Sequence, residues 1–168
     1  MRVPTVLRRR PARLRSVPVL VLAIVLAAVV ALAGWYGDHR AGARDQAVRQ
    51  ALATAPAAAK ALFSYDYRTF DDSVANGRSF ATGAFADEYA QTTAALKQTA
   101  TKQQAVVLAE VSATGVVSAA ADRVELLLYL NQYRRNVTTA GEKVDQNRVV
   151  LTMVPVGGEW KVVKATAI

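Results

Sequence analysis

Carboxylates and tyrosines in the second half of the sequence are the side chains that could transfer protons. Glu125, Tyr129 and Tyr133 recur at four-residue steps, and in a β-strand this spacing places all three on one face. An enzyme would need a carboxylate of this kind with a raised pKa, held opposite a donor that stabilises an oxyanion. A solvated or partner-facing side of a sheet gives the same pattern, so the three residues are candidates for a pocket or for a partner surface. Two further carboxylates, Glu110 and Asp122, are candidates for the same pocket.

A second group of candidates, Tyr65, Asp66 and Tyr67, lies where a long helical pattern should end. The tyrosine rings could cover the core while their hydroxyls make hydrogen bonds. Asp66, with Asp71 and Asp72, forms an acidic turn that could contact a cationic partner or serve only as a helix cap. We therefore expect structural packing first and a partner contact second.

The residue content excludes other catalytic chemistry. The chain has no cysteine, so disulfides, thiolate metal sites and cysteine nucleophiles are excluded. Its single histidine, His39, has no other histidine with which to build a multi-histidine metal site, and a catalytic triad there has no partners. The sequence therefore predicts no catalytic residues, no metal and no cofactor.

The formal charge of +8 belongs to the N-terminal tail. Six of the 21 basic residues, all arginines, lie within residues 1–16, which leaves 15 basic residues against 13 acidic ones. The rest of the chain is nearly neutral and lacks the basic excess of a nucleic-acid-binding domain. Beside an apolar segment, the expected partners of the tail are anionic lipid headgroups rather than DNA.

Residues 17–36 contain no charged side chain and predict a transmembrane helix. As a helix the segment would be about 30 Å long, the hydrocarbon thickness of a bilayer. Arginines precede it and mixed charges follow it, so the positive-inside rule predicts a cytoplasmic tail, 1–16, and an extracytoplasmic domain, 37–168. Trp35 and Tyr36 would mark the outer interface. The expected location is the plasma membrane, crossed once.

A cleaved signal peptide is the alternative interpretation of the same segment. A basic start, an apolar centre and Ala31-Leu32-Ala33 before Gly34 satisfy the small-residue cleavage pattern. Both interpretations export the domain, and they differ on whether it stays anchored. In the anchored form, Ala23, Ala27 and Ala31 form a row of small residues that permits pairing with another membrane helix.

Helical periodicity predicts that the outer domain begins with helices, over residues 40–100. Apolar residues recur at three- and four-residue steps over 48–63, and Pro56 within this run predicts a kink or a break into two helices. The last of the helices, over 85–99, has three large side chains on one face: Phe85, Tyr89 and Leu96.

Runs of β-branched and aliphatic residues then predict a sheet over residues 104–168. We expect four strands, over 105–118, 123–136, 143–156 and 159–164. Alternation over 124–131 gives the second strand one wholly apolar face, and short linkers favour antiparallel pairing. Trp160, in the last strand, is expected in the core, with a partner surface as the alternative. The predicted fold class is α+β, with helices packed on one face of a curved antiparallel four-stranded sheet.

A basic tail, an apolar helix and three segments of the outer domain, in this order, resemble Mce-associated membrane proteins. The three segments are Leu62-Phe63-Ser64-Tyr65-Asp66-Tyr67-Arg68-Thr69, Thr82-Gly83-Ala84-Phe85-Ala86-Asp87-Glu88-Tyr89 and Gly158-Glu159-Trp160-Lys161-Val162. The family comprises accessory proteins of actinobacterial mammalian-cell-entry (Mce) systems. Its outer domains are similar to nuclear transport factor 2-like domains and to the outer domains of type IV secretion scaffold proteins. The resemblance implies a cone of helices on a curved sheet.

The resemblance also implies a function, that of a membrane-anchored accessory or scaffold subunit. Such a subunit would stabilise or assemble an Mce-type lipid-import complex in the cell envelope. The implied partners are Mce substrate-binding proteins, the permease, membrane lipids and a homologous protein of the same family, with no nucleic acid. One alternative is a carrier that binds a lipid or sterol in the cone. Another is an isomerase or hydrolase, which would need a carboxylate inside a closed apolar pocket.

Overall fold

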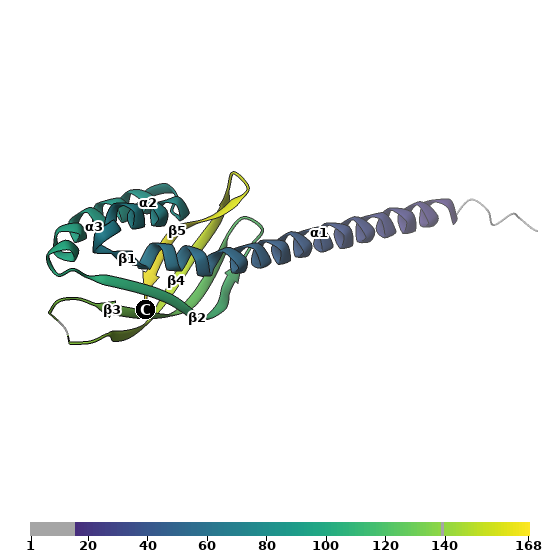
Figure 1. Cartoon of the computed structure of the whole chain (residues 1–168). Helices are drawn as coiled ribbons and strands as arrows, with labels where there is room; N and C mark the ends of the chain where they lie inside the picture. Colours follow the sequence, from purple (N-terminus) through teal and green to yellow (C-terminus); the bar gives the residue numbers. More distant parts are fainter. Residues whose placement is uncertain (1–15, 139) are drawn as a thin grey trace, which may run out of the picture. The chain divides into compact units, whose positions relative to one another are not determined.

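The computed structural model describes the backbone of residues 16–138 and 140–168 and the side chains of residues 25–32, 35, 41–138 and 140–168. The chain divides into two compact units, residues 1–41 and residues 42–168. The second unit contains the sheet and the shorter helices, and it is the unit in which the candidate sites lie (Figure 1).

Helices come first along the chain and strands follow, with one short exception (Figure 1). The helices are α1 (Ser16–Phe63), the 3-10 helix η1 (Tyr67–Thr69), α2 (Phe70–Phe80) and α3 (Gly83–Lys102). The strands are β1 (Tyr65–Asp66), β2 (Val106–Ala119), β3 (Val124–Arg135), β4 (Lys143–Val156) and β5 (Glu159–Ala167). The predicted class, α+β with helices packed on an antiparallel sheet, is confirmed.

One antiparallel sheet contains five strands in the order β1-β2-β3-β4-β5. The prediction of four strands is wrong, because it omits β1. This strand has two residues, Tyr65 and Asp66, which pair with Val107 and Val106 of β2. A two-residue strand is too short to show the alternation from which strands are predicted. The four predicted strands correspond to β2–β5.

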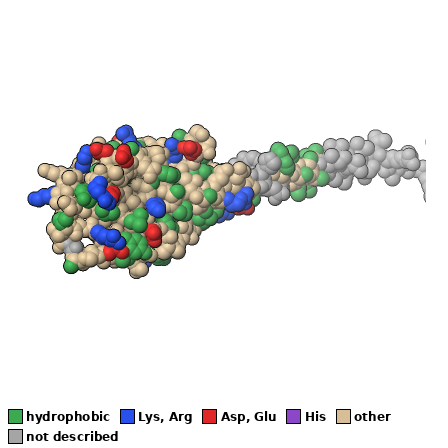
Figure 2. Space-filling view, in the orientation of Figure 1, with side chains coloured by type: hydrophobic (Ala, Val, Ile, Leu, Met, Phe, Trp, Pro, Cys, Tyr) green, Lys and Arg blue, Asp and Glu red, His purple; other side chains and the backbone are tan. Residues whose placement is uncertain are grey.

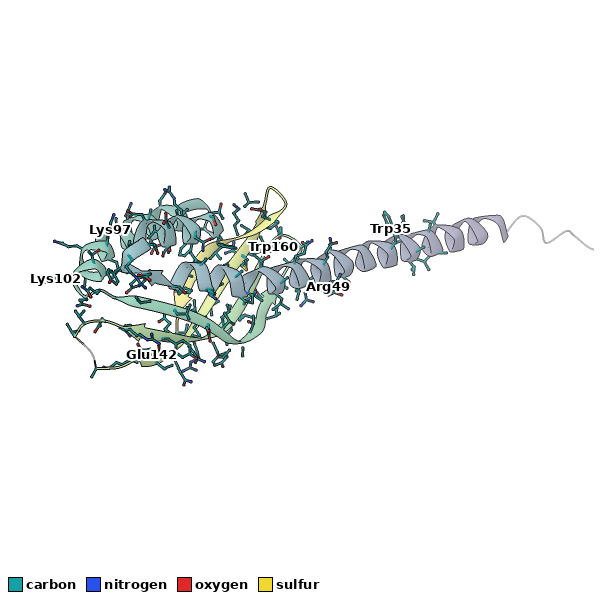
Figure 3. All side chains as sticks on the ribbon, viewed as in Figure 1. Trp35, Arg49, Lys97, Lys102, Glu142 and Trp160 are labelled. Atoms are coloured by element: carbon teal, nitrogen blue, oxygen red, sulfur yellow. The ribbon has the colours of Figure 1, made fainter. Side chains whose placement is uncertain are left out.

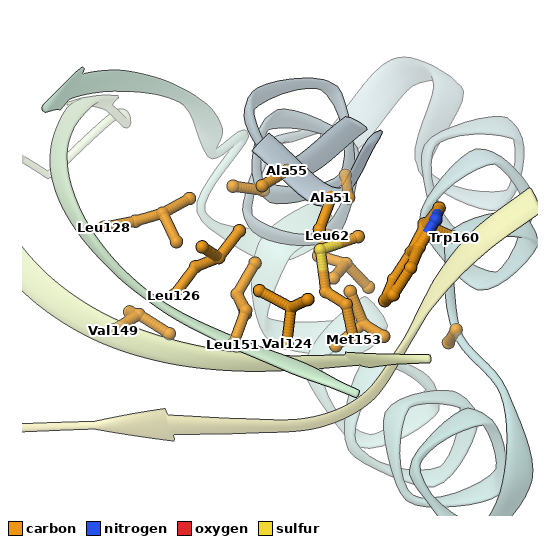
Figure 4. Close-up of a cluster of buried hydrophobic side chains, with 14 of the residues drawn as sticks. Ala51, Ala55, Leu62, Val124, Leu126, Leu128, Val149, Leu151, Met153 and Trp160 are labelled. Atoms are coloured by element: carbon orange, nitrogen blue, oxygen red, sulfur yellow. The ribbon is translucent and has the colours of Figure 1, made fainter. Parts of the chain in front are cut away.

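The core of the second unit lies between α1 and one face of the sheet. Alternate residues of β3, from Val124 to Leu130, are buried, and the alanines of α1 from Ala47 to Ala59 pack against them. Small alanine side chains allow the helix backbone to lie close to the sheet, where large aliphatic side chains fill the space. Figure 4 shows this packing around Leu151. We call the sheet face toward α1 the inner face and the opposite face the outer face.

Helix α1 continues without a break through Pro56. Of the two outcomes predicted at Pro56, the break into two helices is therefore wrong, and the kink stays a prediction. A proline inside a helix loses one backbone hydrogen bond. Buried Ala55, Ala58 and Ala59 lie on both sides of Pro56, and their packing against the sheet holds the helix together there.

The expected membrane span lies within α1. Of the helices in the described part of the chain, none has a stretch long and apolar enough to pass through a membrane. The side chains of residues 17–24, 33, 34 and 36, which belong to the expected span of 17–36, are outside the described residues.

Candidate functional site

The outer face of the sheet carries an exposed apolar row that crosses three strands. Tyr133 of β3 lies directly opposite Leu108 of β2 on one side and Val144 of β4 on the other. Leu108 is 38% exposed and Val144 is 51% exposed. Directly opposite residues of antiparallel strands point to the same face, so the three side chains form one strip. We call it the outer row.

Charged side chains surround the outer row. A depression of 440 Å³ is lined by Val106, Leu108, Glu110, Tyr133, Arg135 and Glu142. In it, Arg135 Nε donates to Glu142 Oε2 at 2.7 Å. Arg134 and Asp145 form a further ion pair, but strand alternation points both side chains to the inner face, away from the outer row. Figure 2 shows hydrophobic, basic and acidic side chains interspersed over one side of the second unit. An apolar centre with a charged rim is typical of protein interfaces.

The candidate carboxylate Glu125 lies on the open outer face. Ser118 Oγ, on the neighbouring strand β2, donates to Glu125 Oε2 at 3.0 Å. Tyr129, on the same face, is 44% exposed, and both Glu110 and Asp122 are exposed. The structure therefore does not enclose any of these carboxylates in an apolar pocket, which is the arrangement that an isomerase or hydrolase would require.

Asp66 serves as a local cap. Its carboxylate accepts a hydrogen bond from the backbone nitrogen of Arg68 at 2.9 Å and one from Arg68 Nη2 at 2.6 Å. These hydrogen bonds hold the pKa of the Asp66 carboxyl below its usual value. The Arg68 guanidinium also lies 5.7 Å from the centre of the Tyr67 ring, and Tyr67 N donates to Ala105 O. Asp66 therefore orders the turn after β1, as a helix cap does.

Tyr65 lines an apolar cavity of 380 Å³. The cavity lies between the ends of α1 and β1, helices α2 and α3, and strands β3–β5. Its apolar and aromatic lining is Leu62, Phe63, Tyr65, Phe70, Val74, Phe85, Tyr89, Leu96, Val149, Ala165 and Ala167. The polar lining residues are Ser64, Glu88, Thr92, Thr93 and Gln132. A volume of this size with mostly apolar walls is typical of small-molecule pockets.

The partly buried titratable groups in the lining of this cavity are two tyrosines rather than a carboxylate. Burial raises the pKa of both Tyr65 and Tyr89 above the usual tyrosine value. The ring of Tyr65 meets that of Phe70 edge to face, with centroids 5.5 Å apart. Glu88, the one carboxylate in the lining of this cavity, is exposed at its edge. The cavity suits an apolar ligand better than proton-transfer chemistry.

The spacing of the large side chains of α3 predicted which face of this helix is turned inward, but it did not predict the cavity. Phe85, Tyr89 and Leu96 fall on one side of α3, as their spacing predicted, and all three are lining residues. Their periodicity indicates a face that is turned inward. It does not reveal whether the space beneath that face is filled, because seven other elements or segments contribute to the wall.

Trp160 is a core residue and is not available to a partner. It is 6% exposed, and its indole Nε1 donates to Gln50 Oε1 of α1 at 2.9 Å. Figure 3 labels Trp160 beside α1. The hydrogen bond satisfies the polar end of a ring whose remaining edge packs in the core. The structure therefore supports the core interpretation of Trp160 over the partner interpretation.

The proposed membrane-helix pairing residues lie on α1. Ala27 and Ala31 are exposed, and the side chain of Ala23 is outside the described residues. Within the residues that the structure describes, no three His, Asp or Glu side chains are grouped closely enough to hold a metal ion.

No known protein-family profile matches the chain. It is similar to two uncharacterized proteins of Mycobacterium tuberculosis, one from strain CDC 1551 / Oshkosh and one from strain ATCC 25618 / H37Rv. Each is 28% identical over 165 residues, which covers 95% of this chain and 74% of the relative. The similarity therefore extends over nearly the whole chain.

Three solved structures share the fold. The chain is similar to an IcmL-like type IV secretion system protein from Legionella pneumophila, with a TM-score of 0.55 and 17% identity over 68% of this chain and 88% of that one. It is similar to CagV of Helicobacter pylori, a VirB8 homolog, with a TM-score of 0.57 and 10% identity over 68% of this chain and 93% of that one. It is also similar to the periplasmic domain of DotI, with a TM-score of 0.57 and 13% identity over 68% of this chain and 89% of that one. The second unit of this chain therefore has the fold of known type IV secretion proteins.

Proposed function

We propose that this protein is a membrane-anchored assembly subunit of the cell envelope and that it contacts its partner through the outer row. The observation that carries the proposal is the strip in which exposed Leu108 and Val144 lie on either side of half-buried Tyr133. Exposed apolar side chains that are contiguous and rimmed by charge mark protein interaction sites. Among the described residues, none of the three side chains belongs to a buried core cluster.

The fold supports an assembly role in the envelope. The similar solved structures are type IV secretion proteins, and one of them is described as a periplasmic domain. The structure also encloses no carboxylate in an apolar pocket among the described residues, so an assembly role fits better than turnover. The finer proposal is that the complex is an Mce-type lipid importer, with substrate-binding proteins or the permease as partners. It rests on the sequence segments that resemble Mce-associated membrane proteins.

The anchor is part of the proposal. The uncharged segment 17–36, preceded by six arginines, would hold the second unit at the outer surface of the plasma membrane. An N-terminal tag that remains on the mature protein in the membrane fraction supports the anchor. Loss of that tag would mean that the segment is a cleaved signal peptide.

Affinity purification of the full chain tests the assembly role. The chain would carry a C-terminal tag in its native envelope, be cross-linked briefly and be extracted with mild detergent. Mass spectrometry should identify envelope transport subunits in stoichiometric amounts, and Mce subunits if the finer proposal is right. A chain that is recovered alone after cross-linking would contradict an assembly role.

A second candidate function is direct carriage of a lipid or sterol, because the 380 Å³ cavity has mostly apolar walls. Native mass spectrometry of the purified chain separates the two functions. A bound lipid that survives purification supports carriage, whereas an empty protein that still retains its partners supports assembly alone.

A further inference from the structure

The two edges of the sheet differ in how they are covered. At one edge, β1 pairs only with Val106 and Val107 of β2, and Ala109 N next to them donates to Ser64 Oγ at 2.8 Å. From Val111 to Ala119, β2 has β3 on one side. Within the described part of the chain, no hydrogen bond joins the backbone of this segment to any other element on its other side. We call Val111–Ala119 the open edge.

The opposite edge, strand β5, is protected. The chain before α3 lies along it, with a bridge between Ala81 and Val162 and a hydrogen bond from Thr82 N to Val162 O at 2.9 Å. Lys161 and Lys164 add charge to the same strand. A covering segment and lysines are the usual means by which proteins prevent a sheet edge from pairing with another chain.

The open edge lacks these protective charges. Its sequence is Val-Ser-Ala-Thr-Gly-Val-Val-Ser-Ala, without a charged residue or a proline. Most of these residues are exposed, among them Val116 at 44% and Val117 at 56%. An exposed, uncharged strand edge presents unpaired backbone groups to another strand. Two β-bulges flank its centre, whereas Ala113–Val116 pairs in regular register with β3.

The open edge can pair with a second copy of itself without opposing charges. In an antiparallel pair of two copies centred on Gly115, Thr114 would lie opposite Val116 within the regular segment, and the bulges at Ser112 and Val117 mark where regular pairing ends. This pair joins two β-branched residues, and it opposes no like charges. A two-fold dimer requires this kind of self-complementary surface, because the same patch is used by both copies.

We propose that a second copy of this chain pairs with it through the open edge, strand β2 against strand β2 in antiparallel orientation. The two five-stranded sheets would then form one continuous sheet. The pairing uses an edge, whereas the outer row lies on a face, so a dimer leaves the outer row free for another partner. The dimer does not depend on the identity of the envelope complex.

Cysteine cross-linking of the full chain in detergent tests this pairing, because the natural chain has no cysteine. A Cβ at Gly115 would meet nothing within 4 Å, so Gly115→Cys fits the fold. Opposite Cα atoms in an antiparallel pair are about 4.5–5.5 Å apart. This separation is within the range of a disulfide, about 4.4–6.8 Å.

Mild oxidation of the Gly115→Cys chain should give a reducible dimer. Val156→Cys, which is 42% exposed at the other end of the sheet, is the matched control and should stay monomeric.

A charge on the open edge provides an independent test. Val117→Lys should convert the concentration-dependent dimer into a monomer in light scattering of the full chain, whereas Val156→Lys should not. Circular dichroism checks that both variants are folded, and if Val117→Lys does not fold, the cross-linking decides. Equal cross-linking of Gly115→Cys and Val156→Cys would overturn the proposal. So would a folded Val117→Lys variant that remains dimeric, or a natural chain that is monomeric at every concentration.

Discussion

The hydroxyl of Tyr89 on α3 lies directly over Gly77 on α2. A Cβ added to Gly77 would be 2.2 Å from Tyr89 Oη and 2.8 Å from the carbonyl oxygen of Ala61. Gly77 is therefore a point of close approach between α2, α3 and the end of α1, and the Tyr89 side chain there also lines the cavity.

Gly77→Ala should destabilise the protein by about 1–3 kcal/mol, because the added methyl group forces either the tyrosine ring or the backbone of α1 to shift. Urea unfolding followed by circular dichroism measures the change. Gly42→Ala is the control, since a Cβ there meets nothing within 4 Å and alanine favours a helix. Adding Tyr89→Phe to Gly77→Ala should restore part of the loss. A Gly77→Ala variant as stable as the natural chain would mean that the two helices are not packed this closely.

Gln50→Leu should lower the free energy of unfolding by about 1–3 kcal/mol, because the indole N–H of Trp160 would lose its acceptor in a part-buried site. Thermal unfolding of the variant and of Gln91→Leu, which replaces an exposed glutamine of α3, gives the comparison. If both changes have the same effect, the hydrogen bond between β5 and α1 does not contribute to stability.

Asp66→Ala should cost about 1 kcal/mol at neutral pH, the usual loss when a capping side chain is removed. The pKa of Asp66 is lower in the folded protein than the ordinary value of 3.8, so its contribution is full above that value. It is lost as the pH falls through the lower folded pKa. The stabilities of the two proteins should therefore converge in acid. Asp87→Ala, whose ion pair with Arg78 is 4.0 Å long and exposed, should show little difference at any pH. A constant gap for Asp66→Ala down to strong acid would contradict the charged cap.

Thr92→Trp tests lipid carriage, because Thr92 is an exposed residue in the wall of the cavity and a tryptophan there would block the opening. If the cavity carries a lipid, the variant should lose most of the lipid that co-purifies with the natural chain, as measured by native mass spectrometry. Thr99→Trp, also exposed on α3 but not part of the lining, should retain it. Equal lipid content in the two variants would exclude the cavity as the binding site.

The sequence predicts best those features that depend on periodicity over many residues. The alternation of β3 predicted which of its side chains are buried, and it placed Glu125, Tyr129 and Tyr133 together on the other face. Strand β1 was missed because two residues cannot show a period. The sequence also left open whether the helix breaks at Pro56 or only bends there, because the outcome depends on tertiary packing of the neighbouring alanines.

The candidate sites were harder to predict, because each is built from several distant segments. Tyr133 was identified, but its neighbours Leu108 and Val144 were not, since strand register cannot be derived from one strand alone. The capping role of Asp66 depends on the position of Arg68 two residues later, a spacing that is visible in the sequence and could have been used. The open edge of β2 becomes visible only when the length of β1 is known.

Partner recovery from the envelope by a charged variant tests whether the protein contacts its partner through the outer row. The full chain with Tyr133→Asp and Val144→Asp would be compared with Ala95→Asp, an exposed change on α3, at equal expression and with circular dichroism to confirm folding. The outer-row variant should lose at least ten-fold in recovered partner, about 1.4 kcal/mol or more of binding free energy, while Ala95→Asp should recover the natural amount. Undiminished recovery by the folded outer-row variant would contradict a partner contact through the outer row.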